Sequence, residues 1–236
     1  GNLVDSITFG ALPSNISYGV SFENENYVAY EDPTPGYENY SDEFLGVLGV
    51  PLIFSHDGGN INSSFDLEII GDGNEEEIRY TLDFTEPNEN SNLYTGPITI
   101  DETSVVRAKA FKEGYLSLHS NTRNYFFNIN SDHPIIHLVS DEYNLFDYNY
   151  GIYSYGTEDY GGYPYFGANF WEDWERPVHI SYYVENMLEF SANAGIKIAG
   201  AYSRGWDQKS LALFARGEYG IGEFQYSFFD NLDYDL

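Results

Sequence analysis

Residues Ile78–Pro87 read IRYTLDFTEP, a β-strand pattern that runs into a turn. Apolar or aromatic residues alternate with polar ones in its first half, as in a strand with one buried face. Thr81, Asp83 and Thr85 have short polar side chains that hydrogen-bond nearby backbone, and the closing proline cannot donate to a sheet. The run Val105–Phe111 has a strand pattern as well. We therefore predict paired strands joined by polar turns.

The rest of the chain carries the same signals. Short β-branched and aromatic runs are bounded by Gly, Asn, Asp and Pro, and convincing helical periodicity is scarce. The further predicted strands are Pro97–Ile100, Ile135–Val139, Val178–Val184, Ala194–Ile198 and Ser210–Ala215. Short helices are predicted only near Asp141–Phe146 and Phe170–Trp174. The fold class is therefore mostly β, without βαβ alternation.

The central segment resembles the chitobiase/β-hexosaminidase C-terminal domain family. The resemblance rests on Ile78–Pro87, on Leu93–Ile98 and on Val105–Phe111 followed by Gly114, and it covers about residues 50–128. Phe84 departs from the family, which usually has Gly there. The resemblance implies an immunoglobulin-like β-sandwich that accompanies enzymes and surface proteins, without implying catalysis. We place this domain at residues 46–130.

The N-terminal segment, residues 1–45, resembles the last strands of a bacterial lamin-tail-like domain. The similar stretches are Ile7–Phe9, Asn15–Gly19 and Pro33–Asn39, the last of which begins with a PTPG turn. The earlier strands of such a domain are not seen here. We therefore expect residues 1–45 to be a C-terminal remnant of that sandwich.

Residues 131–236 resemble the first part of the spore-coat protein H (CotH) kinase-like family. The matching stretches are Asn144–Asp147, Gly151–Tyr153, Asn169–Val178 and Asn193–Leu211. The resemblance implies an atypical α+β kinase fold that binds ATP with a divalent metal and phosphorylates proteins.

Two basic residues at matching positions, Arg204 and Lys209, are the candidate nucleotide-binding residues that this resemblance implies. A lysine can neutralise phosphate oxygens, and an arginine can contact an anion through two hydrogen bonds. The alternative is structural, because a cation among 38 Asp and Glu residues usually pairs with a carboxylate.

Phosphoryl transfer also needs carboxylates that hold Mg²⁺ and an Asp that orients the nucleophile. In the CotH-like family those acids lie beyond the matched segment. We therefore expect an incomplete kinase-like domain, with no catalytic residue and no metal ligand in this chain. ATP and Mg²⁺ are expected only if the missing C-terminal part exists.

Charge and composition exclude several classes. The 236 residues carry 10 Lys and Arg against 38 Asp and Glu, for a formal charge of -28. Nucleic-acid binding draws on basic side chains, which are too few here. The absence of Cys excludes disulfides, thiolate zinc sites and a Cys nucleophile. No apolar run approaches the ~20 residues that span a bilayer.

Three further patterns have both a functional and a structural interpretation. His133 and His137 are spaced for zinc on a helix, but the run around them favours a strand, where they would lie roughly 13 Å apart. Asp72–Glu77 is a solvated acidic turn, with weak surface Ca²⁺ binding left open. The aromatic residues of Tyr143–Trp174 are interpreted mainly as core and loop packing, with sugar stacking as the alternative.

The sequence thus predicts an accessory or interaction segment of a secreted or cell-surface multidomain bacterial protein, non-catalytic as given. Its expected partners are proteins or other domains of the same polypeptide, and carbohydrate is a further candidate. The first alternative is the nucleotide-binding lobe of a CotH-like secreted kinase. The second is a carbohydrate-binding or adhesion module.

Overall fold

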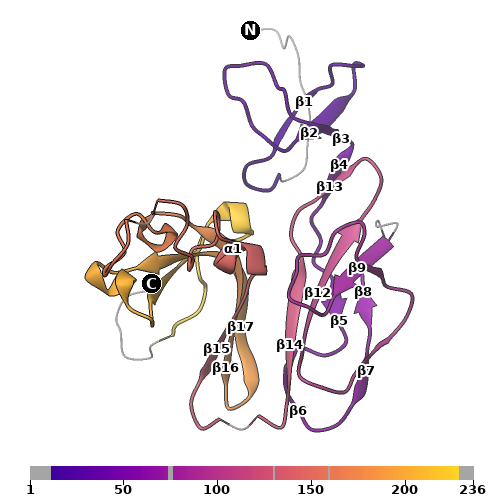
Figure 1. Cartoon of the computed structure of the whole chain (residues 1–236). Coiled ribbons are helices and arrows are strands. Elements are labelled where there is room, and N and C mark those ends of the chain that lie inside the picture. Colours follow the sequence, from indigo (N-terminus) through magenta and orange to yellow (C-terminus); the bar gives the residue numbers. More distant parts are fainter. Residues whose placement is uncertain (1–11, 74–76, 130, 159, 229–236) are drawn as a thin grey trace.

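The computed structural model describes residues 12–73, 77–129, 131–158 and 160–228 (Figure 1). Strands make up 41% of the structure and helices 7%, which confirms the mostly β prediction. No helix in these ranges is long and apolar enough to cross a membrane. The chain forms a small N-terminal sheet, a central sandwich and a C-terminal sheet.

The N-terminal sheet has three antiparallel strands in the order β1-β2-β3. They are β1 (Ser17–Val20), β2 (Tyr27–Tyr30) and β3 (Glu43–Phe44). Tyr30 is fully buried, and its hydroxyl lies 2.9 Å from Oε1 of Glu43. Of the stretches behind the lamin-tail resemblance, Ile7–Phe9 lies outside the described residues, so that resemblance stays a prediction.

The central unit contains a five-stranded sheet in the order β10-β9-β12-β14-β6. Strand β12 pairs antiparallel with β9 and β14, and β14 pairs parallel with β6. The strands are β6 (Gly59–Ile61), β9 (Glu77–Thr81), β10 (Asn92–Leu93), β12 (Ser104–Phe111) and β14 (Asn121–Phe127).

Three strand pairs make up the rest of the central unit: β4 with β13, β5 with β8, and β7 with β11. They are β4 (Gly46–Leu48), β13 (Tyr115–Ser117), β5 (Ile53–Phe54), β8 (Ile69–Ile70), β7 (Phe65–Leu67) and β11 (Ile98–Ile100). Side chains from these pairs and from β9, β12 and β14 form one apolar core, including Leu67, Val106 and Tyr125. This arrangement is consistent with the predicted sandwich.

The turn after β9 contains Phe84, at the position where the chitobiase-type family usually has Gly. The Thr81 hydroxyl donates to the Thr85 carbonyl at 2.6 Å, and Oδ1 of Asp83 accepts from the Thr85 hydroxyl at 2.6 Å. Phe84 has φ +70°, a backbone conformation that glycine adopts without strain. The turn therefore keeps a conformation suited to Gly although Phe occupies the position.

The C-terminal sheet is antiparallel, in the order β15-β16-β17-β18. Its strands are β15 (Ile135–Val139), β16 (Arg176–Val184), β17 (Met187–Ala199) and β18 (Ser210–Phe214). A two-residue turn joins β16 to β17, and Glu185 and Asn186 both have positive φ there, as in a type I′ hairpin.

Helical structure in the described part of this segment is short. Helix α1 (Glu142–Phe146) is accompanied by the 3₁₀ turns η1 (Asn169–Trp171), η2 (Tyr202–Gly205) and η3 (Gly217–Tyr219). The two predicted helical sites are thus found, although the second is a single 3₁₀ turn. The α+β kinase-like architecture of residues 131–236 stays a prediction.

Strand β14 has buried side chains on both faces. It belongs to the central unit and lies beside the C-terminal sheet (Figure 1). Tyr125 points into the sandwich core, whereas Asn124 and Phe126 point toward β16. The Asn124 amide donates to Oγ of Ser181 at 2.8 Å, and the Phe126 ring packs edge-on against Tyr183. The predicted boundary near residue 130 therefore separates two units that share a buried interface.

Two glycines allow this close packing. A Cβ on Gly58 would lie 2.7 Å from the Asn124 carbonyl, and one on Gly59 would lie 2.7 Å from the Asn186 carbonyl. Both glycines also have positive φ. The tip of the β16–β17 hairpin thus packs directly on the backbone of Gly59. A residue with a side chain at this position would push the hairpin away.

Asn124→Ala is expected to destabilise the protein by about 1–3 kcal/mol, because the buried Ser181 hydroxyl loses its amide donor. A double-mutant cycle with Ser181→Ala, measured by urea unfolding, should give a coupling energy of about 1 kcal/mol. Strict additivity of the two substitutions would show that this hydrogen bond does not join the units.

Candidate functional sites

Arg204 and Lys209, the predicted nucleotide-binding residues, lie in one loop between β17 and β18. The Lys209 ammonium donates to the carbonyls of Arg204 at 2.7 Å and Trp206 at 2.9 Å, and it sits 3.8 Å from the centre of the Phe170 ring. Burial lowers the pKa of Lys209, an effect that nearby Asp207 opposes. The Lys209 ammonium therefore binds backbone carbonyls of the loop to which it belongs.

Arg204 is held by backbone as well. Its Nε donates to the Gly200 carbonyl at 2.8 Å, and Nη1 donates to the Trp171 carbonyl at 3.0 Å. Across the described part of the chain, neither Arg204 nor Lys209 forms an ion pair with a carboxylate. The structure thus brings the two cations together and occupies them with backbone carbonyls.

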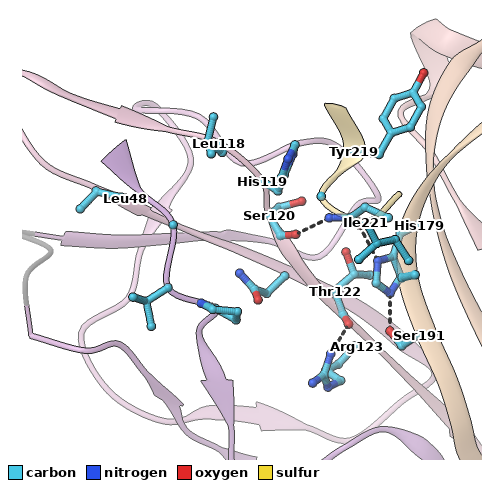
Figure 2. A pocket seen from close by; sticks show the side chains of 17 residues that line it. Leu48, Leu118, His119, Ser120, Thr122, Arg123, His179, Ser191, Tyr219 and Ile221 are labelled. Atoms are coloured by element: carbon cyan, nitrogen blue, oxygen red, sulfur yellow. Dashed lines mark hydrogen bonds between the residues drawn. The ribbon is translucent and has the colours of Figure 1, made fainter. Parts of the chain in front are cut away.

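A cleft of about 350 Å³ lies between β14 and the strands β16 and β17 (Figure 2). Figure 2 shows His179 directed toward Ser191 on one wall, with Ser120 and Thr122 on the other. A second hollow of about 270 Å³ shares His119, Ser120, His179 and Asn193 with it and extends toward Glu86 and Arg107. Sequence analysis did not identify this cleft, because its walls come from separate units.

His179 is the central titratable group of the cleft wall. Its Nδ1 lies 2.7 Å from Oδ1 of Asn193, and its Nε2 lies 2.9 Å from Oγ of Ser191. Burial lowers the pKa of His179 to about 4, an effect that the hydrogen bond from its Nδ1 to Asn193 opposes. The ring is therefore neutral near pH 7, and both nitrogens are engaged, which leaves neither for a metal or a substrate proton.

The second hollow holds a charge network. Nη2 of Arg107 pairs with Glu86, and Nζ of Lys109 lies 3.7 Å from the same carboxylate. Ser120 donates to Glu86 at 2.7 Å, and Arg107 also donates to the Phe84 carbonyl at 2.8 Å. Arg107 is buried, so Glu86 supplies the counter-charge that such a position requires. The network stabilises the wall of the cleft.

The remaining predicted features lie elsewhere. His133 is exposed ahead of β15, whereas His137 lies within β15 and packs against Phe126, in agreement with the predicted strand. Among the described residues, no three His, Asp or Glu side chains gather as a metal site. Residues 74–76 of the acidic turn Asp72–Glu77 lie outside the described residues, so weak Ca²⁺ binding there stays a prediction.

The aromatic residues of the C-terminal segment divide between core and surface. Phe170 is buried and packs with Ile152 and β16, as the core interpretation predicts. Several tyrosines and two phenylalanines are exposed instead: Tyr143, Phe146, Tyr148, Tyr150, Tyr155, Tyr160, Tyr163 and Phe166. Surface aromatics at this density leave the sugar-stacking alternative open.

Comparison with known families identifies the central unit. Residues 56–122 match the family model of the chitobiase/beta-hexosaminidase C-terminal domain. The chain therefore contains a domain of this family, which confirms that part of the predicted resemblance. The lamin-tail-like and CotH-like resemblances stay predictions. Neither curated proteins nor solved structures gave a match to the chain.

Lowering the pH from about 6.5 to about 4 is expected to remove the stability that depends on neutral His179. The unfolded chain binds the proton at the ordinary pKa of about 6.5, whereas the folded chain binds it near 4. The unfolded state therefore holds more protons in this window, and the free energy of unfolding decreases as the pH is lowered. Melting temperatures at pH 7.5 and 4.5 should drop less for His179→Gln than for the unsubstituted chain.

The exposed His133 supplies the control, because His133→Gln should follow the unsubstituted chain at both pH values. Equal losses for His179→Gln and the unsubstituted chain would contradict the assignment of a buried neutral imidazole.

Proposed function

We propose that this chain is an accessory and interaction segment of a secreted or cell-surface multidomain protein, and that it is non-catalytic on its own. The observation that carries the proposal is the use of Arg204 and Lys209. Five backbone carbonyls accept hydrogen bonds from these two side chains, those of Gly200, Trp171, Glu172, Arg204 and Trp206. Cations used in this way stabilise a loop and are not free to hold phosphate.

The cleft supports the same conclusion. Of the two histidines that line it, His179 has both nitrogens engaged, and Glu86 in the adjoining hollow is shared between Arg107, Lys109 and Ser120. A general base needs a free lone pair that can reach a substrate. The His179 ring and the Glu86 carboxylate instead have protein side chains as their hydrogen-bond and ion-pair partners, as the members of structural networks do.

An extracellular location is supported by the matched domain, which is typical of extracellular glycoside hydrolase proteins. The charge of -28 favours solubility and disfavours nucleic acids and anionic membrane surfaces. Partners of such a chain would be uncharged or basic. They include proteins, other domains of the same polypeptide, and carbohydrate.

One observation favours a second function, the nucleotide-binding lobe of a CotH-like kinase. Two cations lie in one loop and, among the described residues, neither has a carboxylate partner, although the chain holds 38 acids. Phosphate oxygens could replace the carbonyls if the loop rearranged. The test must therefore measure nucleotide binding directly.

Titration calorimetry with about 1 mM ATP and excess Mg²⁺ is expected to give no binding heat, because the two cations are already occupied. Incubation with ATP and a mixture of protein substrates is expected to transfer no phosphate. Lys112→Met is the matched control for a lysine substitution, since Lys112 lies over Tyr115, outside the 200–209 loop.

ATP binding that disappears in Lys209→Met and persists in Lys112→Met would overturn the proposal and establish the nucleotide-binding lobe. Melting temperatures of both variants must accompany the titration, because Lys209→Met also removes two hydrogen bonds from the loop.

A further inference from the structure

Four flat groups form a stack on the surface of the C-terminal unit. Cζ of Arg176 lies 4.9 Å from the Trp174 ring centre and 3.6 Å from that of Tyr150. The Tyr150 and Tyr143 rings are stacked, with centres 4.7 Å apart and planes 20° apart. The order is therefore Trp174, Arg176, Tyr150 and Tyr143.

The outer end of this stack is open. A guanidinium at 3.6 Å and a ring at 4.7 Å would overlap on one face of Tyr150, so they cover its two opposite faces. Tyr143 is then the last member, and 55% of its surface is exposed. An exposed ring that is fixed from behind is a flat apolar platform.

The platform is rigid because its turn is heavily bonded. Oδ1 of Asp147 accepts from the backbone N–H of Asn149 and of Tyr150, both at 2.9 Å. Nη2 of the buried Arg176 donates to the Tyr150 carbonyl at 2.8 Å while its guanidinium covers the Tyr150 ring. Ordering such a site before binding reduces the entropy lost when a ligand arrives.

Gly151 brings the turn against α1. A Cβ at this position would lie 2.5 Å from the backbone nitrogens of both Phe146 and Asp147. Only glycine permits this approach, because the nearest atoms are backbone and cannot move aside. Trp174 and Arg176 lie within residues 169–178, and Tyr143 and Tyr150 directly precede residues 144–147 and 151–153.

The chemistry around Tyr143 limits what can bind there. Asp141 and Glu142 precede it directly, and the whole chain carries a charge of -28. Anionic ligands are repelled, whereas hydroxyl groups can donate to carboxylates. A pyranose ring has an apolar face for stacking and a rim of hydroxyl donors, so it fits both features.

We propose that Tyr143, backed by Tyr150 and Arg176, binds the pyranose rings of uncharged glycans. The proposal names a ligand class for the interaction segment and in that sense rests on the function proposed above. The platform belongs to the C-terminal unit and lies outside the matched residues 56–122. The proposal therefore assigns sugar binding to a part of the chain that the family match does not cover.

Titration calorimetry with uncharged hexasaccharides of glucose, N-acetylglucosamine, mannose and xylose tests the proposal. At least one is expected to bind the whole chain, and hexagalacturonate, which carries a carboxylate on each ring, is expected not to bind. Tyr143→Ala should weaken binding about tenfold, the contribution of one aromatic stack. Tyr143→Phe keeps the ring face and should retain most of the affinity.

Tyr37→Ala is the matched control, because Tyr37 is 85% exposed and lies in the N-terminal unit. Absence of binding to all four uncharged hexasaccharides would overturn the proposal, as would equal affinity in Tyr143→Ala and Tyr37→Ala. The proposal would also be overturned if the chain bound hexagalacturonate but none of the uncharged hexasaccharides. None of these results affects the ATP titration, so failure of this inference and failure of the accessory function are distinguishable.

Gly151→Ala gives an independent check on rigidity. The variant should lose about 2–3 kcal/mol of stability and should bind the sugar more weakly than its folded fraction explains. Gly49→Ala is the control, since a Cβ on Gly49 meets nothing within 4 Å. If folded Gly151→Ala binds with full affinity, the ordered turn is not part of the site.

Discussion

The structure depends on β14 being buried on both faces. Tyr125 completes the sandwich core on one side, and Asn124 and Phe126 pack against β16 on the other. Asn124 is fully buried, so the NH2 group of its amide needs acceptors, and Ser181 and Tyr183 supply them. This polar contact joins the C-terminal sheet to β14, and the cleft lined by His179 and the hollow lined by Arg107 and Glu86 lie between the two units.

Backbone carbonyls hold three cations of the C-terminal unit, whereas Lys197 and Arg216 pair with the carboxylates of Asp173 and Glu175. Arg204 and Lys209 bond the loop after β17, and Arg176 bonds the carbonyl of Tyr150. A carbonyl accepts a charge-assisted hydrogen bond without bringing a second charge into a crowded loop. In an acidic chain, this leaves the aromatic residues of these loops exposed on ordered backbone, which suits recognition of uncharged ligands.

Much of the fold could be predicted from local patterns. The alternation in Ile78–Leu82 and Val105–Phe111, and the spacing of residues around the Asp83 turn, identified the central domain and its strands. These features depend on neighbours in sequence, which a pattern displays. The assignment of Arg204 and Lys209 to nucleotide binding stays a prediction, and their hydrogen-bond partners could not be read from the sequence.

The sequence by itself determined the β class, the central domain, the short helical sites and the exclusion of thiol chemistry. Tertiary structure alone decided that the central and C-terminal units share an interface, that His179 is buried and neutral, and that Tyr143 ends a stack. The reason is physical: each of these depends on contacts between residues far apart in the chain, such as Asn124 with Ser181 and Tyr150 with Arg176. Burial and charge pairing arise only when those surfaces meet.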